Sequence, residues 1–192
     1  NVDVLTICEK MSERQVMKSN LSEDSASPQE TKRQRILEGA MAVVLRYGYA
    51  RTTMDDVAKE VGISRPALYL QFKNKTEIYT ALAEGMMGQA LEGAKRALAG
   101  PGDLEYRVFA AIKTGILDPT DFLMATAHGA ELLDMKHNMA ADVILACRVK
   151  KTALLSEAFE TSGVAKIKGL SGQALADMLL DGIEGLKMRV KT

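Results

Sequence analysis

Tryptophan is absent from the sequence, and proline, cysteine and histidine are rare, with 4, 2 and 2 copies. Because proline breaks helices, its scarcity leaves long stretches free to be helical. The two cysteines, Cys8 and Cys147, lie far apart, and His128 and His137 share no ligand face, so no spacing fits a metal site. Cysteines used in this way fit a reduced compartment, and we expect a cytoplasmic protein without a metal or other cofactor.

Long apolar runs are also missing. No stretch of eighteen uncharged apolar residues occurs, so we expect no membrane span. Charged residues at positions 3, 9 and 10 stand where a secretory signal needs an apolar core, so no such signal is expected. The sequence has no phosphate-binding glycine loop, no serine nucleophile elbow, no HExxH and no paired-cysteine motif. We therefore expect that the protein is not an enzyme.

What the sequence does contain is an ordinary globular composition, with 47% hydrophobic and 26% charged residues. Its net charge is zero, but residues 31–75 hold nine Lys and Arg against four Asp and Glu. A local basic block favours a polyanion such as nucleic acid as the partner. On charge alone, a merely solvated surface explains the block equally well.

The pattern of apolar residues changes at residue 29. Residues 1–28 are polar and lack periodicity, and we expect them to form a flexible leader. Beyond them apolar residues recur at helical spacing between start and stop signals, and no alternating strand pattern occurs. We expect an all-α chain, with a three-helix domain at 29–74 and a larger helical domain at 75–192. The predicted helices cover residues 30–47, 53–61, 65–71, 75–98, 103–115, 120–136, 139–161 and 171–190, with a break at Asp118-Pro119.

Two of these helices, 53–61 and 65–71, match the helix-turn-helix pattern, in which the first helix braces a second one that enters the major groove of DNA. Thr53 followed by Asp56 predicts a capping box at the start of the first helix. Gly62 supplies the left-handed residue that ends it, and Ser64 is the next start signal.

The second helix carries the features that a groove-inserted helix needs. Leu68 and Phe72 are spaced i, i+4 and would anchor its inner face. Tyr69 must then point elsewhere, where its hydroxyl can reach a phosphate or a base edge. Lys73 and Lys75 flank the exit, and small or polar residues form the tip, namely Ser64, Arg65, Pro66 and Ala67.

Residues 52–82, TTMDDVAKEVGISRPALYLQFKNKTEIYTAL, resemble the DNA-binding region of TetR-family transcriptional regulators. The resemblance is strong over about 31–82 and only architectural beyond. It implies an N-terminal helix-turn-helix domain and a C-terminal ligand-binding and dimerisation domain. It also implies a homodimer that binds a palindromic double-stranded DNA operator and is released by a small-molecule inducer.

Carried over residue by residue, the resemblance places phosphate contacts at Thr53, Tyr69 and Lys75, and base-edge contacts at Arg65, Pro66 and Ala67. Gln71 is a departure, because many members have His before the Phe. Arg65 as an ordinary exposed arginine is the plainer alternative, as is a half-buried core role for Tyr69. Lys32, Arg33 and Arg35 form either a solvated face or a flanking contact with DNA. The predicted DNA-binding residues are Thr53, Ser64, Arg65, Pro66, Ala67, Tyr69, Gln71, Lys73 and Lys75.

Two further sites are expected in residues 75–192. A ligand pocket among helices 76–98, 103–115 and 120–136 would use apolar side chains together with His128, which stands i, i+3 from Glu131; core packing is the alternative for each of them. The pocket candidates are Met86, Phe109, Ile112, Phe122, Met124, His128 and Leu132. A dimer interface would form from the last two long helices, one pair from each subunit. Its candidates are Met139, Val143, Ala146, Leu175, Leu179, Gly182, Ile183 and Leu186.

A rival hypothesis is a helical interaction module whose basic segment binds an acidic protein. An activator, or a regulator that ignores small molecules, is also compatible with the sequence. The operator sequence, the inducer and the regulated genes do not follow from it.

Overall fold

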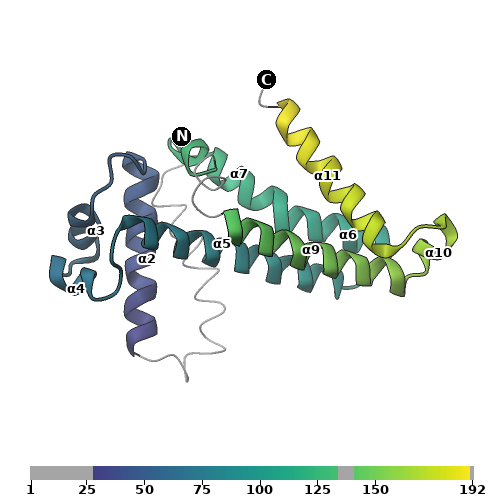
Figure 1. The fold of residues 1–192 in the computed structure, drawn as a ribbon, viewed down its shortest axis with the longest axis horizontal. Helices are drawn as coiled ribbons and strands as arrows, with labels where there is room; N and C mark the ends of the chain where they lie inside the picture. Colours follow the sequence, from purple (N-terminus) through teal and green to yellow (C-terminus); the bar gives the residue numbers. More distant parts are fainter. Residues whose placement is uncertain (1–27, 134–140, 191–192) are drawn as a thin grey trace. The chain divides into compact units, whose positions relative to one another are not determined.

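The computed structural model describes residues 28–133 and 141–190. Within these ranges the regular elements are helical and none is a strand (Figure 1), which confirms the all-α prediction. The predicted leader at 1–28 lies outside the described residues except for Pro28, which begins the first of these helices. In chain order the elements are α2 (Pro28–Tyr47), α3 (Met54–Val61), α4 (Arg65–Tyr69), α5 (Lys75–Leu98), α6 (Leu104–Ile112), the π-helix η1 (Lys113–Leu117), α7 (Asp118–Met124), α9 (Ala141–Thr161), α10 (Val164–Lys168) and α11 (Gly172–Val190).

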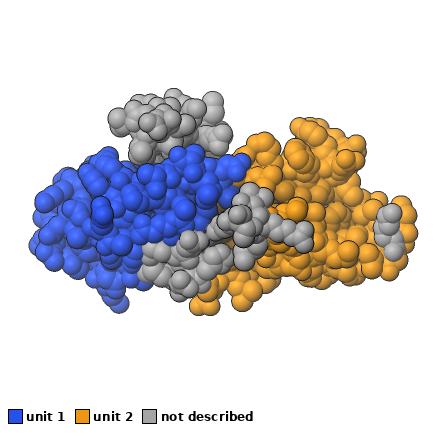
Figure 2. All heavy atoms as spheres, turned by 90° about the horizontal axis from the view of Figure 1, so that it is seen from above, with its two compact units in different colours: residues 1–84, 120–140 blue, residues 85–119, 141–192 orange. Residues whose placement is uncertain are grey.

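The chain divides into two compact units (Figure 2). Unit 1 comprises residues 1–84 and 120–140, and unit 2 comprises residues 85–119 and 141–192. Helices α5 and α7 each contribute to both units. The predicted domain boundary at residue 74 lies just before α5, whereas the two units divide within α5, between residues 84 and 85. The assignment of separate DNA-binding and ligand-binding domains therefore stays a prediction.

In unit 1, α3 packs on α2 and α4 packs on α3 (Figure 1). The apolar stripe of α2 faces this core, with Ile36 and Val43 fully buried, as its helical spacing predicts. Tyr47, which the same stripe predicts to face inward, is half exposed and lies under the Arg46 guanidinium. Leu45 is buried as well.

The predicted helix break at Asp118-Pro119 is wrong. The chain passes from α6 through η1 into α7 without leaving helical structure. Pro119 has no N–H and cannot donate to the Gly115 carbonyl four residues earlier, which is why proline ends most helices. Here the preceding turn widens to a π-helix, with the Asp118 N–H donating to the Lys113 carbonyl. The Nζ of Lys151 donates to the Gly115 carbonyl at 2.7 Å.

The predicted helix at 120–136 is interrupted. Helix α7 ends at Met124, and helical structure resumes over 129–133. Thr126 ends α7, because its hydroxyl donates to the Leu123 carbonyl at 2.8 Å. Gly129 then packs so closely on the Leu123 backbone that any larger residue would collide with it. A glycine inside an apolar stripe therefore marks a close backbone approach rather than a mid-helix position.

Unit 2 is a helical layer whose largest contact joins α9 to α11. Its core contains Leu98, Ala111, Leu155, Phe159 and Leu180. At the edge of the α9–α11 contact, Arg148 lies between three carboxylates of α11, with its Nη2 2.6 Å from Asp181 and its Nη1 3.2 Å from Glu184. No helix in the described part of the chain is long and apolar enough to cross a membrane.

Candidate nucleic-acid interface

Helix α3 begins and ends as its sequence signals predict. The Thr53 hydroxyl accepts from the Asp56 N–H at 3.2 Å, and the Asp56 carboxylate accepts from the Thr53 N–H at 2.9 Å, which completes the capping box. The Thr53 hydroxyl also donates to Asp56, and these bonds lower the pKa of the Asp56 carboxyl. Gly62 ends α3 in the left-handed conformation with φ +72°, where residues with a Cβ are disfavoured. The cap and the glycine together fix the angle at which the chain leaves α3.

Helix α4 is short, and it is anchored from one side only. The Ser64 hydroxyl accepts from the Ala67 N–H at 3.3 Å, and Pro66 occupies the first turn, where the missing N–H costs nothing. Leu68 and Phe72 are buried to 0% and 1% exposure, as their i, i+4 spacing predicts. Tyr69 remains 41% exposed. The tip and outer side of α4 therefore face solvent.

Arg65 is exposed but already held in position. Its Nη1 lies 3.2 Å from Oδ2 of Asp55 on α3, and its Nη2 donates to the Tyr69 hydroxyl at 3.4 Å. The Tyr69 hydroxyl and the Asp55 carboxylate both raise the pKa of the Arg65 guanidinium. Exposed ion pairs are weak, so a base edge or a phosphate can replace the carboxylate. The fork of Arg65 is thus oriented before DNA arrives.

The chain after α4 is held by α2. The Arg33 guanidinium stacks on the Phe72 ring, 4.1 Å from its centroid, and Nη1 donates to the Gln71 carbonyl at 3.3 Å. Of the three basic residues left open on this helix, Arg33 is therefore engaged within unit 1, whereas Lys32 and Arg35 are exposed. Leu70 is 83% exposed, which leaves it free for contact with a partner.

Lys75 has an internal role that the sequence did not reveal. Its ammonium reaches the carbonyls of Tyr49, Ala50 and Thr52, at 3.1, 3.4 and 3.2 Å, and lies 4.4 Å from the centre of the Tyr49 ring. These contacts tie the start of α5 to the turn between α2 and α3. The phosphate contact that the resemblance assigns to Lys75 would compete with them. Lys73 is exposed, and its side chain is better placed for a phosphate.

Replacing Lys75 with Met is expected to lower the free energy of unfolding by about 1–2 kcal/mol, because it leaves the carbonyls of the turn without a charged donor. This corresponds to a melting temperature lower by about 2–8 °C. Lys73→Met is the matched control and should leave the melting temperature unchanged while it weakens DNA binding. Scanning calorimetry of the two variants measures the difference. Equal melting temperatures would show that the Lys75 contacts do not stabilise the turn.

The predicted ligand-pocket residues are divided between the two units. His128 and Leu132 lie in unit 1, where His128 Nδ1 is 3.6 Å from Glu131, and Glu131 accepts from the Ala50 N–H at 3.0 Å. Glu131 therefore serves the same turn as Lys75. Leu132 is buried, and its carbonyl accepts from the Tyr79 hydroxyl at 2.9 Å. The remaining candidates are Phe109 and Met124, which are more than half exposed, and Met86, Ile112 and Phe122, which are half-buried.

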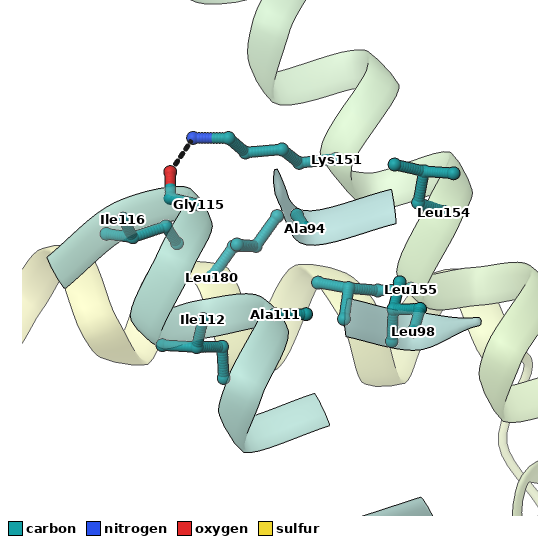
Figure 3. A pocket seen from close by; sticks show the side chains of 10 residues that line it. All are labelled: Ala94, Leu98, Ala111, Ile112, Gly115, Ile116, Lys151, Leu154, Leu155 and Leu180. Atoms are coloured by element: carbon teal, nitrogen blue, oxygen red, sulfur yellow. Dashed lines mark hydrogen bonds between the residues drawn. The ribbon is translucent and has the colours of Figure 1, made fainter. Parts of the chain in front are cut away.

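A cleft does occur in unit 2, and Ile112 is the one predicted pocket residue that lines it. It encloses about 10 Å³, room for about one water molecule. Figure 3 shows that Lys151 points across its rim to Gly115, while aliphatic side chains form the remaining wall. The lining residues are Ala94, Leu98, Ala111, Ile112, Gly115, Ile116, Lys151, Leu154, Leu155 and Leu180.

The predicted dimer residues differ in their exposure. Leu175 and Leu179 are half-buried against the core of their own unit, which leaves less of each for a partner. Ala146, Gly182 and Leu186 are exposed, and Val143 and Ile183 are half-buried. Met139 lies outside the described residues. The same two helices expose three further apolar residues, namely Leu145, Val149 and Met178.

These features together define a class of protein. A short helix, braced by a second through a glycine turn and exposing an arginine and a tyrosine, is a DNA-reading helix-turn-helix. Among the described residues no group of three His, Cys, Asp or Glu side chains could hold a metal ion. The described residues thus contain a helix-turn-helix of the kind by which transcriptional regulators bind DNA.

Comparison with known proteins identifies the family. Residues 36–82 match the family model described as bacterial regulatory proteins, tetR family. The transcriptional activator FasR of Mycolicibacterium smegmatis is 28% identical over 123 residues, which cover 64% of this chain and 54% of FasR. The regulator TtgR of Pseudomonas putida is 41% identical over 58 residues, which cover 30% of this chain and 27% of TtgR. The matched part thus spans about half of FasR and about a quarter of TtgR.

Among solved structures, the fatty acid degradation regulator FadR from Bacillus halodurans has the same fold, with a TM-score of 0.63 at 18% identity, and the match covers 84% of this chain and 83% of FadR. Residues 36–82 thus form a DNA-binding region of the TetR family of transcriptional regulators.

Sequence reasoning missed Asp55, Arg33 and Lys151. Asp55 lies one position before the capping Asp56, in the first turn of α3. Carboxylates are common in the first turn of a helix, so the sequence gives no sign that Asp55 contacts Arg65. Arg33 was left among exposed basic residues, because only the fold brings it to Phe72. Lys151 directly follows Lys150 on α9, and no local pattern separates it from this exposed neighbour.

Proposed function

We propose that this chain is a ligand-responsive transcriptional repressor. As a cytoplasmic homodimer it binds a palindromic operator, and a small-molecule inducer releases it. The observation that carries the proposal is the outward display of Arg65 and Tyr69 on a helix whose inner face is fixed by Leu68 and Phe72. Arginine at this position fits bidentate bonding to guanine in the major groove.

The proposal requires two copies of the chain to pair, because one short helix reads too few bases to discriminate among DNA sites. Two copies of α4 would lie one DNA turn apart, about 34 Å, and read the halves of a palindrome. The exposed apolar residues of α9 and α11, Leu145, Val149 and Met178, offer a surface for a second copy. Gly182 and Gly185 leave open space beside them, which permits close helix approach.

Release by a ligand would act through α5. This helix begins at Lys75, which holds the turn before α3, and its last turns contribute Ala94 and Leu98 to the cleft of unit 2. A ligand that prefers a shifted α5 would favour a dimer whose α4 helices no longer match the operator. Only unequal affinity for the two arrangements can produce this effect.

Repression requires nothing beyond occupancy of the operator, which is why we propose it although FasR is named an activator. A helical module that binds an acidic protein is the rival. Fluorescence anisotropy with mixed-sequence duplex DNA and with polyglutamate, each titrated with salt, separates the two. We expect binding to the duplex that falls about 10³- to 10⁵-fold between 50 and 200 mM salt, as for proteins with six to ten phosphate contacts. Preference for polyglutamate would contradict the proposal.

A further inference from the structure

We propose that the cleft of unit 2 is a binding site for an aliphatic carboxylate, with the acid group at the ammonium of Lys151 and the chain among the leucines and isoleucines. This inference deepens the proposed function, because it names the chemical class of the inducer. Its direct test, described below, measures ligand binding without DNA.

The cleft combines one charged group with an otherwise apolar lining. Lys151 is the only charged residue among its ten lining residues, and the others are Ala, Leu, Ile and Gly (Figure 3). Leu154 and Leu155 follow Lys151 on α9, and Ile112 and Leu180 complete the aliphatic wall from α6 and α11. One cation at the edge of an aliphatic surface matches an amphipathic acid, and it matches neither a neutral nor a cationic molecule of the same shape.

The ammonium of Lys151 is not saturated by strong acceptors. It donates to the Gly115 carbonyl at 2.7 Å, and its other close partner is the thiol of Cys147, a weak acceptor. The Glu184 carboxylate acts on it only at longer range, and it lies 3.2 Å from Arg148. An ammonium carries three donors, so Lys151 can also donate to a carboxylate oxygen while it donates to the Gly115 carbonyl.

Partial burial makes the charged form of Lys151 energetically unfavourable when no anion is near. Removal from solvent lowers the pKa of the Lys151 ammonium, the sign of a charge that its surroundings do not fully stabilise. Leucine or methionine would fill the same space without this cost. A bound carboxylate would supply the missing counter-charge to this half-buried ammonium, and a charge-assisted hydrogen bond is stronger there than in open solvent.

The ligand-free cleft is too small for an alkyl chain, since it encloses about 10 Å³. Entry of the chain must therefore separate the walls. The wall opposite Lys151 contains the π-helix η1, where Gly115 packs on α5 so closely that a Cβ would lie 3.0 Å from Ala94. Displacing η1 would thus press on α5. This is the helix whose first residue holds the turn before α3.

Isothermal titration calorimetry on the full chain, with decanoate and decanol below their aggregation limits, tests the site. The two probes share a tail and differ in the charged head. We expect decanoate to bind with one site per chain and about 10- to 100-fold more tightly than decanol, the range for a hydrogen bond to a charged group. Equal affinities of the two probes would overturn the proposal.

Three variants locate the effect. Lys151→Met should reduce the preference for decanoate to less than about twofold, whereas Lys151→Arg should keep most of it because the charge remains. Lys150→Met, an exposed neighbour on the same helix, should leave it unchanged. Loss in Lys150→Met, or full retention in Lys151→Met, contradicts the site. If Lys151→Met does not fold, Lys151→Gln replaces it with the same expectation. A failure of DNA recognition would appear in operator binding by ligand-free protein and would leave these titrations unaffected.

Discussion

Replacing Arg65 with Ala is expected to weaken binding to the best DNA site by about 10- to 100-fold and to remove the base preference at one position of each half-site. The guanidinium is exposed at the tip of α4, and Asp55 and Tyr69 already hold its fork in place. Little order is lost when it binds a base, so its removal costs the full contact. Stability should not change, because Arg65 buries nothing in the core.

Anisotropy titrations of wild type and Arg65→Ala on one selected site and on a scrambled site measure this loss. Arg96→Ala is the matched control, because it removes an exposed arginine from the far end of α5. The control should lose at most about twofold on both sites. If Arg65→Ala loses the same small factor on both sites, Arg65 makes at most a phosphate contact and does not read a base.

The second large effect concerns assembly. Leu145→Asp is expected to weaken the dimer at least about 100-fold, because a carboxylate without a partner would be buried at an apolar interface. Leu145 is 62% exposed on α9, beside Val149 one turn on, and on α11 Met178 is equally exposed. Operator binding should fall with dimerisation, since a monomer reads one half-site only.

Analytical ultracentrifugation across a range of protein concentrations measures the dimer. Ile167→Asp is the control, because this residue of α10 is 81% exposed and lies outside the two helices that we expect to pair. It should sediment as wild type does. A dimeric Leu145→Asp variant with normal operator affinity would place the interface elsewhere.

The helix-turn-helix could be predicted from the sequence because its signals are local. Thr53 and Asp56 cap α3, Gly62 ends it and Ser64 starts α4, and each of these needs only its near neighbours to act. The anchors Leu68 and Phe72 followed from helical spacing alone. For the same reason the boundaries of α3 and α5 agree with the predicted ones to within one residue.

The errors arise where distant residues decide. Pro119 ends a helix by every local rule, yet the chain continues through a π-turn, and Lys151 from α9 reaches the Gly115 carbonyl. Lys75 is a basic residue at a position where the resemblance implies a phosphate contact. Its ammonium instead donates to three carbonyls of the turn before α3. The residue spacing around Pro119 or around Lys75 does not predict either contact, because each joins residues far apart in the sequence.

The predicted ligand pocket also depends on contacts between distant residues. Phe109 and Met124 are large apolar residues of the kind that line ligand pockets, and both are more than half exposed in the fold. A stripe of apolar residues marks a side that avoids water, and it does not tell which other helix will cover that side. The cleft that does occur depends on residues from α5, α6, η1, α9 and α11, which only the tertiary fold assembles.

Selection of bound fragments from random duplex DNA, run in parallel with wild type and Arg65→Ala, tests the central claim that α4 reads DNA in two copies. The account predicts that wild type enriches an inverted repeat with half-sites about one helical turn apart, and that the variant loses a single base preference in each half. An unenriched pool from wild type, or the same sequence from both proteins, would contradict it.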